Sequence, residues 1–146
     1  MEAVLFIGLQ ASGKSSFYKE HFFATHARIS LDLLKTRHRE KRFFSTCLET
    51  HQRLVVDNTN PTRSDRAAYI QPARTAGFCV IGYYFCSRVG ECLRRNMGRP
   101  LAVPDAAILS TAKKLELPAR DEGFDMLHYV YLDDGVFQVE PWQDEV

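Results

Sequence analysis

The sequence lacks several features that would place it in other classes of protein. Its four cysteines, Cys47, Cys79, Cys86 and Cys92, form no C-x-x-C pair and show no zinc-site spacing, so neither a disulfide framework nor a zinc site is indicated. No apolar run reaches the length of a membrane span, and no basic region precedes the first apolar run. We therefore expect a cytoplasmic protein without a signal peptide, a membrane segment or a disulfide partner.

Strong charge of either sign is also missing. The 19 basic and 18 acidic residues leave a formal net charge of +1, whereas a protein that binds a long nucleic acid through many phosphates is usually more basic. Any contact with nucleic acid should therefore be local. There is no internal repeat or low-complexity linker, and 146 residues with 45% hydrophobic content predict a single globular domain over residues 1–146. Nothing in the sequence indicates an oligomeric state.

The most informative stretch is residues 8–16, here called the phosphate loop. Gly8, Gly13, Lys14 and Ser15 match the pattern G-x-x-x-x-G-K-[ST], in which backbone N–H groups wrap nucleotide phosphates, the lysine reaches the β- and γ-phosphates and the hydroxyl binds Mg²⁺. The pattern requires a strand before it and a helix after it, and the flanking residues fit both. The alternative is a glycine-rich turn that carries a lysine by chance. The predicted nucleotide-binding residues of the loop are Gly8, Ala11, Ser12, Gly13, Lys14, Ser15 and Ser16.

Strands and helices are predicted to alternate along the chain. Short apolar runs predict strands at residues 3–7, 27–30, 53–57, 78–85 and 126–132. Between them, helices are predicted at residues 13–24, 62–76, 91–98 and 105–115, with one more helical face over residues 43–48. This alternation is typical of an α/β protein with a largely parallel sheet.

Two aspartates follow predicted strands, where ligands bind in open α/β sheets. Asp32 lies where the second strand gives way to a helix, so it is a candidate catalytic carboxylate or simply a helix cap. Asp57 ends an apolar strand and resembles the second nucleotide motif of P-loop proteins, whose carboxylate holds Mg²⁺ directly or through water. The alternative for Asp57 is an ordinary turn before a helix.

Two basic stretches have both a structural and a functional interpretation. Residues 35–42 contain no apolar side chain, which fits either a solvated helix face or a surface for a phosphate-rich acceptor. Arg95 and Arg99 are four residues apart and would share a face of a continuous helix. That face is either solvated or part of a lid that neutralises the triphosphate during transfer.

Taken together, these segments resemble the kinase domain of polynucleotide 5′-hydroxyl kinases, within the small P-loop kinases. The matching segments are residues 8–16, Asp32, residues 55–61, Arg95-Asn96 with Arg99, residues 103–104 and residues 122–124. The resemblance implies a three-layer P-loop kinase fold. Its five-stranded, mainly parallel sheet would have the order 2-3-1-4-5, with helices on both faces and an arginine-bearing lid. It also implies a donor site for ATP and Mg²⁺, with an acceptor cleft opposite.

The resemblance also assigns roles to individual residues. Lys14, Asp32 and Arg99 would be catalytic, with Asp32 as the general base and Arg99 as the lid cation. Arg95 would lie near the nucleotide, and Ser15 and Asp57 would hold the metal. Phage members carry arginines where this chain has Leu31 and Lys35, and lysine cannot form the bidentate fork of a guanidinium. The predicted acceptor-binding residues are Asp32, Lys35, Arg37 and Arg39.

The expected activity is transfer of the γ-phosphate of ATP to a hydroxyl, with the 5′-hydroxyl of DNA or RNA as the first choice of acceptor. A small-molecule kinase acting on a sugar, nucleoside or antibiotic is the alternative; near-neutral charge favours it and the basic run after Asp32 opposes it. A regulatory module that binds ATP without turnover is a third possibility, against which the presence of both Lys14 and Asp32 argues.

Overall fold

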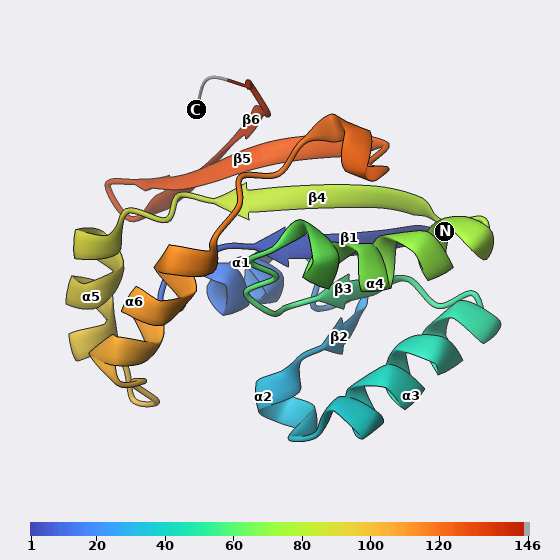
Figure 1. Cartoon of the computed structure of the whole chain (residues 1–146), viewed down its shortest axis with the longest axis horizontal. Coiled ribbons are helices and arrows are strands. Elements are labelled where there is room, and N and C mark those ends of the chain that lie inside the picture. The colour runs from blue at the N-terminus through green and yellow to red at the C-terminus, as the bar shows by residue number, and fades with distance from the viewer. Residues whose placement is uncertain (145–146) are drawn as a thin grey trace.

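A computed structural model describes residues 1–144, so the last two residues of the predicted domain 1–146 lie outside the described part. A six-stranded sheet in the order β2-β3-β1-β4-β5-β6 forms its centre (Figure 1). The strands are β1 (Glu2–Ile7), β2 (Ala27–Ile29), β3 (Leu54–Val56), β4 (Cys79–Phe85), β5 (Met126–Asp133) and β6 (Val136–Pro141). The helices are α1 (Lys14–His21), α2 (Leu31–Leu34), α3 (Arg37–Glu49), α4 (Arg63–Thr75), α5 (Val89–Met97) and α6 (Asp105–Lys114), with a 3₁₀ helix η1 (Arg120–Glu122).

The predicted order 2-3-1-4-5 is confirmed for the first five strands, which are all parallel. The prediction of five strands is wrong, because β6 adds an antiparallel edge strand next to β5. The connection is a tight hairpin in which Asp134 and Gly135 have φ values of 53° and 76°. Such a pair of positive φ angles is what a two-residue hairpin turn requires, and Asp-Gly is a preferred sequence for it.

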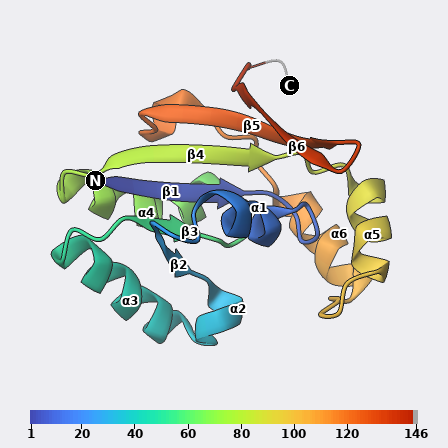
Figure 2. The same ribbon diagram turned by 180° about the vertical axis from the view of Figure 1, so that it is seen from behind.

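The central strand β1 is buried from Ala3 to Ile7 and supplies side chains to both faces of the sheet. Ala3, Leu5 and Ile7 face the core beneath α3 and α4, whereas Val4 and Phe6 pack with residues of α1 on the other face. Figure 2, seen from behind, shows α1 alone over the middle of that second face. Strands covered on both sides read as continuous apolar runs, which explains why β1 and β3 were recognisable in the sequence.

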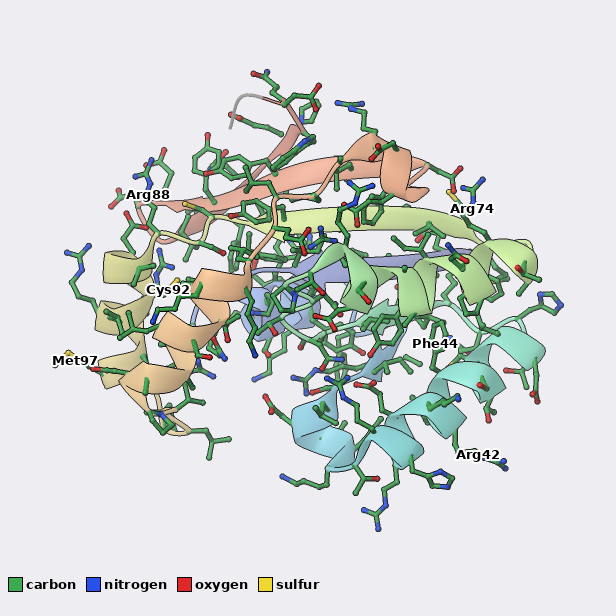
Figure 3. The ribbon with its side chains drawn as sticks, in the orientation of Figure 1. Arg42, Phe44, Arg74, Arg88, Cys92 and Met97 are labelled. Atoms are coloured by element: carbon green, nitrogen blue, oxygen red, sulfur yellow. The ribbon has the colours of Figure 1, made fainter. Side chains whose placement is uncertain are left out.

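The segment after β2 consists of two helices rather than one. Helix α2 ends at Leu34, Lys35 has a positive φ of 74°, and the Thr36 side chain then caps α3 by accepting a hydrogen bond from the Arg39 N–H at 3.2 Å. In Figure 3, Phe44 points from α3 toward the sheet and Arg42 points away from it. The basic run 35–42 is therefore divided between a turn and the solvent-facing start of an amphipathic helix.

The carboxyl ends of the parallel strands lie at one edge of the sheet. The arrowheads of β1 and β4 point toward α5 and α6 (Figure 1), and the register aligns Leu5 with Val56. The phosphate loop after β1 and Asp57 after β3 consequently emerge side by side. Within residues 1–144, no helix combines the length and the apolar character needed to cross a membrane.

Candidate active site

A cleft of about 700 Å³ opens at this edge of the sheet. It lies between the phosphate loop, α2, the β5–β6 hairpin and the lid, by which we mean residues 89–104. The predicted site residues that line it are Ala11, Gly13, Lys14, Ser15, Ser16, Asp32, Arg37, Asp57, Arg95 and Arg99. The predicted residues absent from its lining are Gly8, Ser12, Lys35 and Arg39.

Gly8 and Ser12 support the phosphate loop from behind. The Gly8 N–H donates to the Thr59 carbonyl at 3.0 Å, and the Ser12 side chain is buried. Gly13 adopts a φ of 102° directly before α1, a conformation that glycine accepts at little cost. The loop therefore presents the N-terminus of α1 to the cleft, which is the arrangement that binds phosphates through backbone N–H groups and the helix dipole.

Lys14 is a buried cation held by loop oxygens. Its Nζ donates to the Leu9 carbonyl at 2.6 Å, to the Gly8 carbonyl at 3.0 Å and to the Ser12 Oγ at 3.4 Å. The pKa of Lys14 is lowered to about 8, mainly by burial; Asp57 opposes the change, and the nearby Arg99 contributes to it. An anion bound beside Lys14 would reverse this effect, so the site favours a negatively charged ligand.

Arg99 supplies a second cation with unused hydrogen-bonding capacity. Among the described residues, its buried Nη1 has no hydrogen-bond partner. An unsatisfied buried donor of this kind is costly unless a ligand completes it. Lys14 and Arg99 thus fit the phosphates of a nucleotide by both charge and donor chemistry.

Ser15 and Asp57 meet at the inner end of the cleft, and sequence reasoning missed the residue that joins them. The Ser15 Oγ donates to the Asp57 Oδ2 at 3.0 Å. Arg28 on β2 donates from Nε to the same Oδ2 at 2.8 Å and from Nη2 to the Ser15 Oγ at 3.1 Å. The only available signal was a charged residue within a short strand paired beside the strand that delivers Asp57.

This pair of oxygens suits a hard cation. The Asp57 side chain is only 2% exposed, and its carboxylate lies next to the Ser15 hydroxyl. The Arg28 guanidinium already donates hydrogen bonds to both groups. The described residues contain no cluster of three or more His, Cys, Asp or Glu side chains that could hold a metal by itself. Two oxygen ligands completed by water and phosphate match the preference of Mg²⁺ rather than that of zinc.

Asp32 lies across the cleft as the second residue of α2, with an exposed side chain. It does not cap the helix. Ser30 is the N-cap, and its Oγ accepts from the Leu33 N–H at 3.4 Å. The helix-capping role considered for Asp32 is therefore filled by Ser30, and the Asp32 carboxylate is available to the cleft.

The other predicted acceptor residues are not brought together. Arg37 lines the cleft beside Asp32, and its Nη1 donates to Glu40 Oε1 at 3.1 Å. Lys35 and Arg39 are exposed and lie outside the cleft lining. Of these three predicted acceptor-binding cations, only Arg37 shares the cleft lining with Asp32.

The lid helix lies close to its predicted extent of residues 91–98, with Arg99 just beyond it. Helix α5 ends at Met97, which points outward in Figure 3, so Arg95 and Arg99 do not share a face of one continuous helix. Both arginines still reach the cleft. Arg95 donates to the Ala11 carbonyl at 3.4 Å, and the buried Asn96 closes the loop through two hydrogen bonds to Val103 at 2.6 and 3.0 Å.

The β5–β6 hairpin is a part of the site that the sequence prediction did not include. Leu132, Gly135 and Phe137 line the cleft. The Phe137 ring packs on Gly13 so closely that a Cβ there would lie 2.9 Å from it. The Asp134-Gly135 turn signal was present in the sequence and could have indicated the hairpin.

Comparison with known proteins places these features in a family. The family model described as an AAA domain matches residues 4–118. A bifunctional polynucleotide phosphatase/kinase of Schizosaccharomyces pombe is 26% identical over 129 residues, which is 84% of this chain and 32% of that protein. A putative bifunctional polynucleotide phosphatase/kinase of Acanthamoeba polyphaga mimivirus is 25% identical over 97% of this chain and 36% of its own length. The chain thus spans about a third of each of these relatives.

Solved structures show the same fold at low identity. A gluconokinase from Sinorhizobium meliloti superposes with a TM-score of 0.64 at 16% identity, covering 88% of this chain and 82% of its own. Chaetomium thermophilum Kti12, solved in complex with ADP-AlF₃, superposes with a TM-score of 0.65 at 14% identity, covering 90% of each chain.

Proposed function

Because the chain belongs to the AAA domain family and has a P-loop kinase fold, we propose that it transfers the γ-phosphate of ATP to a 5′-hydroxyl end of DNA or RNA. The observation that carries this proposal is the composition of one cleft. Asp32 lines the same cleft of about 700 Å³ as Lys14 and Arg99, which supports a role for its carboxylate as the proton acceptor in a site that also holds two cations. A module that only bound nucleotide would have no use for the carboxylate.

On the donor side, the proposed role of the residues is to position the triphosphate and to stabilise the charge that develops during transfer. Phosphoryl transfer passes through a loose transition state in which charge spreads over the phosphoryl oxygens, so preorganised cations contribute most of the catalysis. The Lys14 ammonium and the Arg99 guanidinium would contact these oxygens, and Arg95 would hold the lid near the nucleotide. Ser15 and Asp57 would hold Mg²⁺, which supplies further charge neutralisation when it is bound.

On the acceptor side, Asp32 would accept the proton of the attacking hydroxyl. A carboxylate within hydrogen-bond reach of the nucleophile typically contributes about 10²–10⁴-fold to the rate. Arg37 lies beside it and would bind a phosphate of the acceptor strand, a contact for which a planar guanidinium is well suited. The similarity to two bifunctional polynucleotide phosphatase/kinases supports a polynucleotide as the acceptor.

A small-molecule kinase is the second candidate, and one observation favours it. Lys35 and Arg39 lie outside the cleft, which leaves Arg37 as the one cation from residues 35–39 in its lining. A single guanidinium matches one anionic group of a compact acceptor as well as one phosphate of a strand.

The test is transfer of ³²P from [γ-³²P]ATP in the presence of Mg²⁺ to a panel of acceptors. The panel contains 5′-hydroxyl DNA and RNA oligonucleotides, the same oligonucleotides with a 5′-phosphate as matched controls, and a set of sugars, nucleosides and aminoglycoside antibiotics. We expect label only on the 5′-hydroxyl oligonucleotides. Label on a metabolite alone would establish the second candidate, and ATP binding without transfer to any acceptor would indicate the regulatory module.

A further inference from the structure

We propose that Glu40 is a positioning residue that fixes Asp32 and Arg37 in the cleft through a buried hydrogen-bond network. The network links α3, the segment after β3, and α4 to the first residue of α2. The inference rests on the proposed function in taking Asp32 as the general base. None of the sequence patterns pointed to Glu40, which is the one acidic residue in the basic run 35–42.

Glu40 is a buried carboxylate with three donors. Its side chain is 4% exposed. The Tyr69 hydroxyl donates to Oε1 at 2.6 Å, the Arg37 Nη1 donates to Oε1 at 3.1 Å, and the Asn58 Nδ2 donates to Oε2 at 2.7 Å. A buried carboxylate is costly without such partners, so the network holds its members in one arrangement.

The chemistry of Glu40 determines the orientation of Asn58. An ionised carboxylate only accepts hydrogen bonds, so Asn58 must turn its NH₂ group toward Glu40. Its carbonyl oxygen then points the other way, and Oδ1 accepts the Leu31 backbone N–H at 2.9 Å. A flipped amide would place its oxygen against the Glu40 carboxylate, acceptor to acceptor, and its NH₂ group against the Leu31 N–H, donor to donor.

The Leu31 N–H is where this hydrogen-bond network comes within one residue of Asp32, the proposed general base. Helix α2 has only four residues and none of them is buried; Leu34, at its far end, packs partly buried against the core. At the end that carries Asp32, the helix is held by the Ser30 cap and by the hydrogen bond from Leu31 to Asn58. Asp32 is the next residue, and a displacement of about 1 Å at a reacting group can cost roughly 10²-fold in rate.

The same carboxylate also orients the cleft cation. The Arg37 side chain is 70% exposed, yet its Nη1 is held by Glu40 and lies 3.4 Å from the Tyr69 hydroxyl. Burial, together with the hydrogen bond to Glu40, raises the pKa of Tyr69, so the hydroxyl keeps its proton and remains a donor at neutral pH. Glu40 thus couples the proton acceptor and the anion-binding residue of the acceptor side.

The test compares Glu40→Ala and Glu40→Gln with Glu49→Ala, a matched control on the exposed end of the same helix. Amide hydrogen exchange at Leu31, kcat and KM for ATP, and the affinity for an ATP analogue are measured for each. For Glu40→Ala we expect exchange at Leu31 to rise at least tenfold and kcat to fall about 10²-fold. Affinity for the analogue should stay within about twofold of wild type, because the phosphate loop is not part of the network.

Glu40→Gln keeps the shape of the side chain and serves if the alanine variant does not fold. One amide oxygen cannot satisfy three donors, so an intermediate effect on exchange and kcat is expected. Unchanged exchange at Leu31, or faster exchange with unchanged kcat, would overturn the proposal. So would parallel losses of nucleotide affinity and kcat, which indicate general destabilisation. If the wild type transfers phosphate to no acceptor, the proposed function fails, whereas the exchange measurement still decides whether Glu40 holds α2.

Discussion

The functional groups on the donor and acceptor sides of the cleft are held in place by different kinds of interaction. On the donor side the functional atoms follow buried strands, and Lys14 and Asp57 are themselves buried, at 8% and 6% exposure. On the acceptor side Asp32 sits on a helix of four residues with no buried side chain. Packing places the donor groups, whereas the hydrogen bonds that Asn58 and Ser30 accept hold the end of α2 that carries the acceptor carboxylate.

This difference predicts how the donor and acceptor sides respond to amino-acid substitution. A packed core has few alternative arrangements, so donor geometry should survive most substitutions outside it. A one-turn helix held by a few hydrogen bonds can shift when one bond is lost, and a new set of polar partners can move it elsewhere. Acceptor preference should therefore be easier to alter than nucleotide binding.

Lys14→Ala should produce the largest effect, because it removes a buried cation that serves both binding and transfer. We expect kcat/KM for ATP to fall by about 10⁴-fold, with nucleotide affinity also reduced. Steady-state kinetics and calorimetric binding of an ATP analogue provide the measurement, and Lys114→Ala on the exposed end of α6 provides the control. Near-normal kcat in Lys14→Ala would remove the basis for the donor assignment.

Asp32→Ala should lower kcat by about 10³-fold while leaving the affinity for ATP unchanged, since the carboxylate acts on the hydroxyl and not on the nucleotide. Comparing its binding isotherm with that of Lys14→Ala would separate the two sides of the cleft. A variant with wild-type rates would show that Asp32 is not the base, and Asp57 would then have to be considered.

Arg28→Ala addresses the inner end of the donor side. Arg28 and a metal ion would compete for Ser15 and Asp57, so we expect Mn²⁺ to bind the nucleotide complex about 3–10-fold more tightly by electron paramagnetic resonance. Without metal, the variant should lose roughly 1–3 kcal/mol of stability, because the buried Asp57 loses its partner. Arg53→Ala, an exposed arginine just before β3, is the control. Equal Mn²⁺ affinities in wild type and variant would contradict the competition.

The smallest expected effect is the uptake of protons when nucleotide binds. Because Lys14 has a pKa of about 8 in the free protein and bound phosphates would raise it, nucleotide binding at pH 8 should take up about half a proton. The uptake is measured by calorimetry in buffers of different ionisation enthalpy, and the affinity for nucleotide should weaken as the pH rises above 8.

The lowered pKa of Lys14 has the opposite effect on folding. The unfolded chain binds more protons between pH 8 and the ordinary value of 10.5, so this group makes stability increase with pH in that window. Absence of proton uptake would mean that Lys14 is already charged in the free protein.

Much of the donor side was predictable from the sequence, because its signals are local. The glycine positions of the phosphate loop, the lysine at the start of α1 and the apolar run before Asp57 are each contained in a short segment. The alternation of strands and helices predicted the parallel sheet, and the order of its first five strands is confirmed. Roles assigned to single residues remain predictions that the experiments above address.

The acceptor side was less predictable, because its contacts join distant parts of the chain. Glu40 meets Asn58 and Tyr69 across 18 and 29 residues of sequence, and no local pattern records such pairs. Arg28 meets Asp57 only through strand pairing. The sixth strand was missed for another reason. No strand is predicted after residues 126–132, although the Asp134-Gly135 turn closely follows them and leads into β6.

Phe137 packs on Gly13 although 124 positions separate them, so the nucleotide site joins the first strand–helix unit to the last hairpin. During synthesis on a ribosome, Gly13 of the phosphate loop would emerge 124 residues before Phe137, so this wall of the cleft would form only after β6 had been made. Tight nucleotide binding would then require the β5–β6 hairpin to be in place. A nascent chain stalled after β4 would hold the glycine-rich loop but lack one side of its cleft.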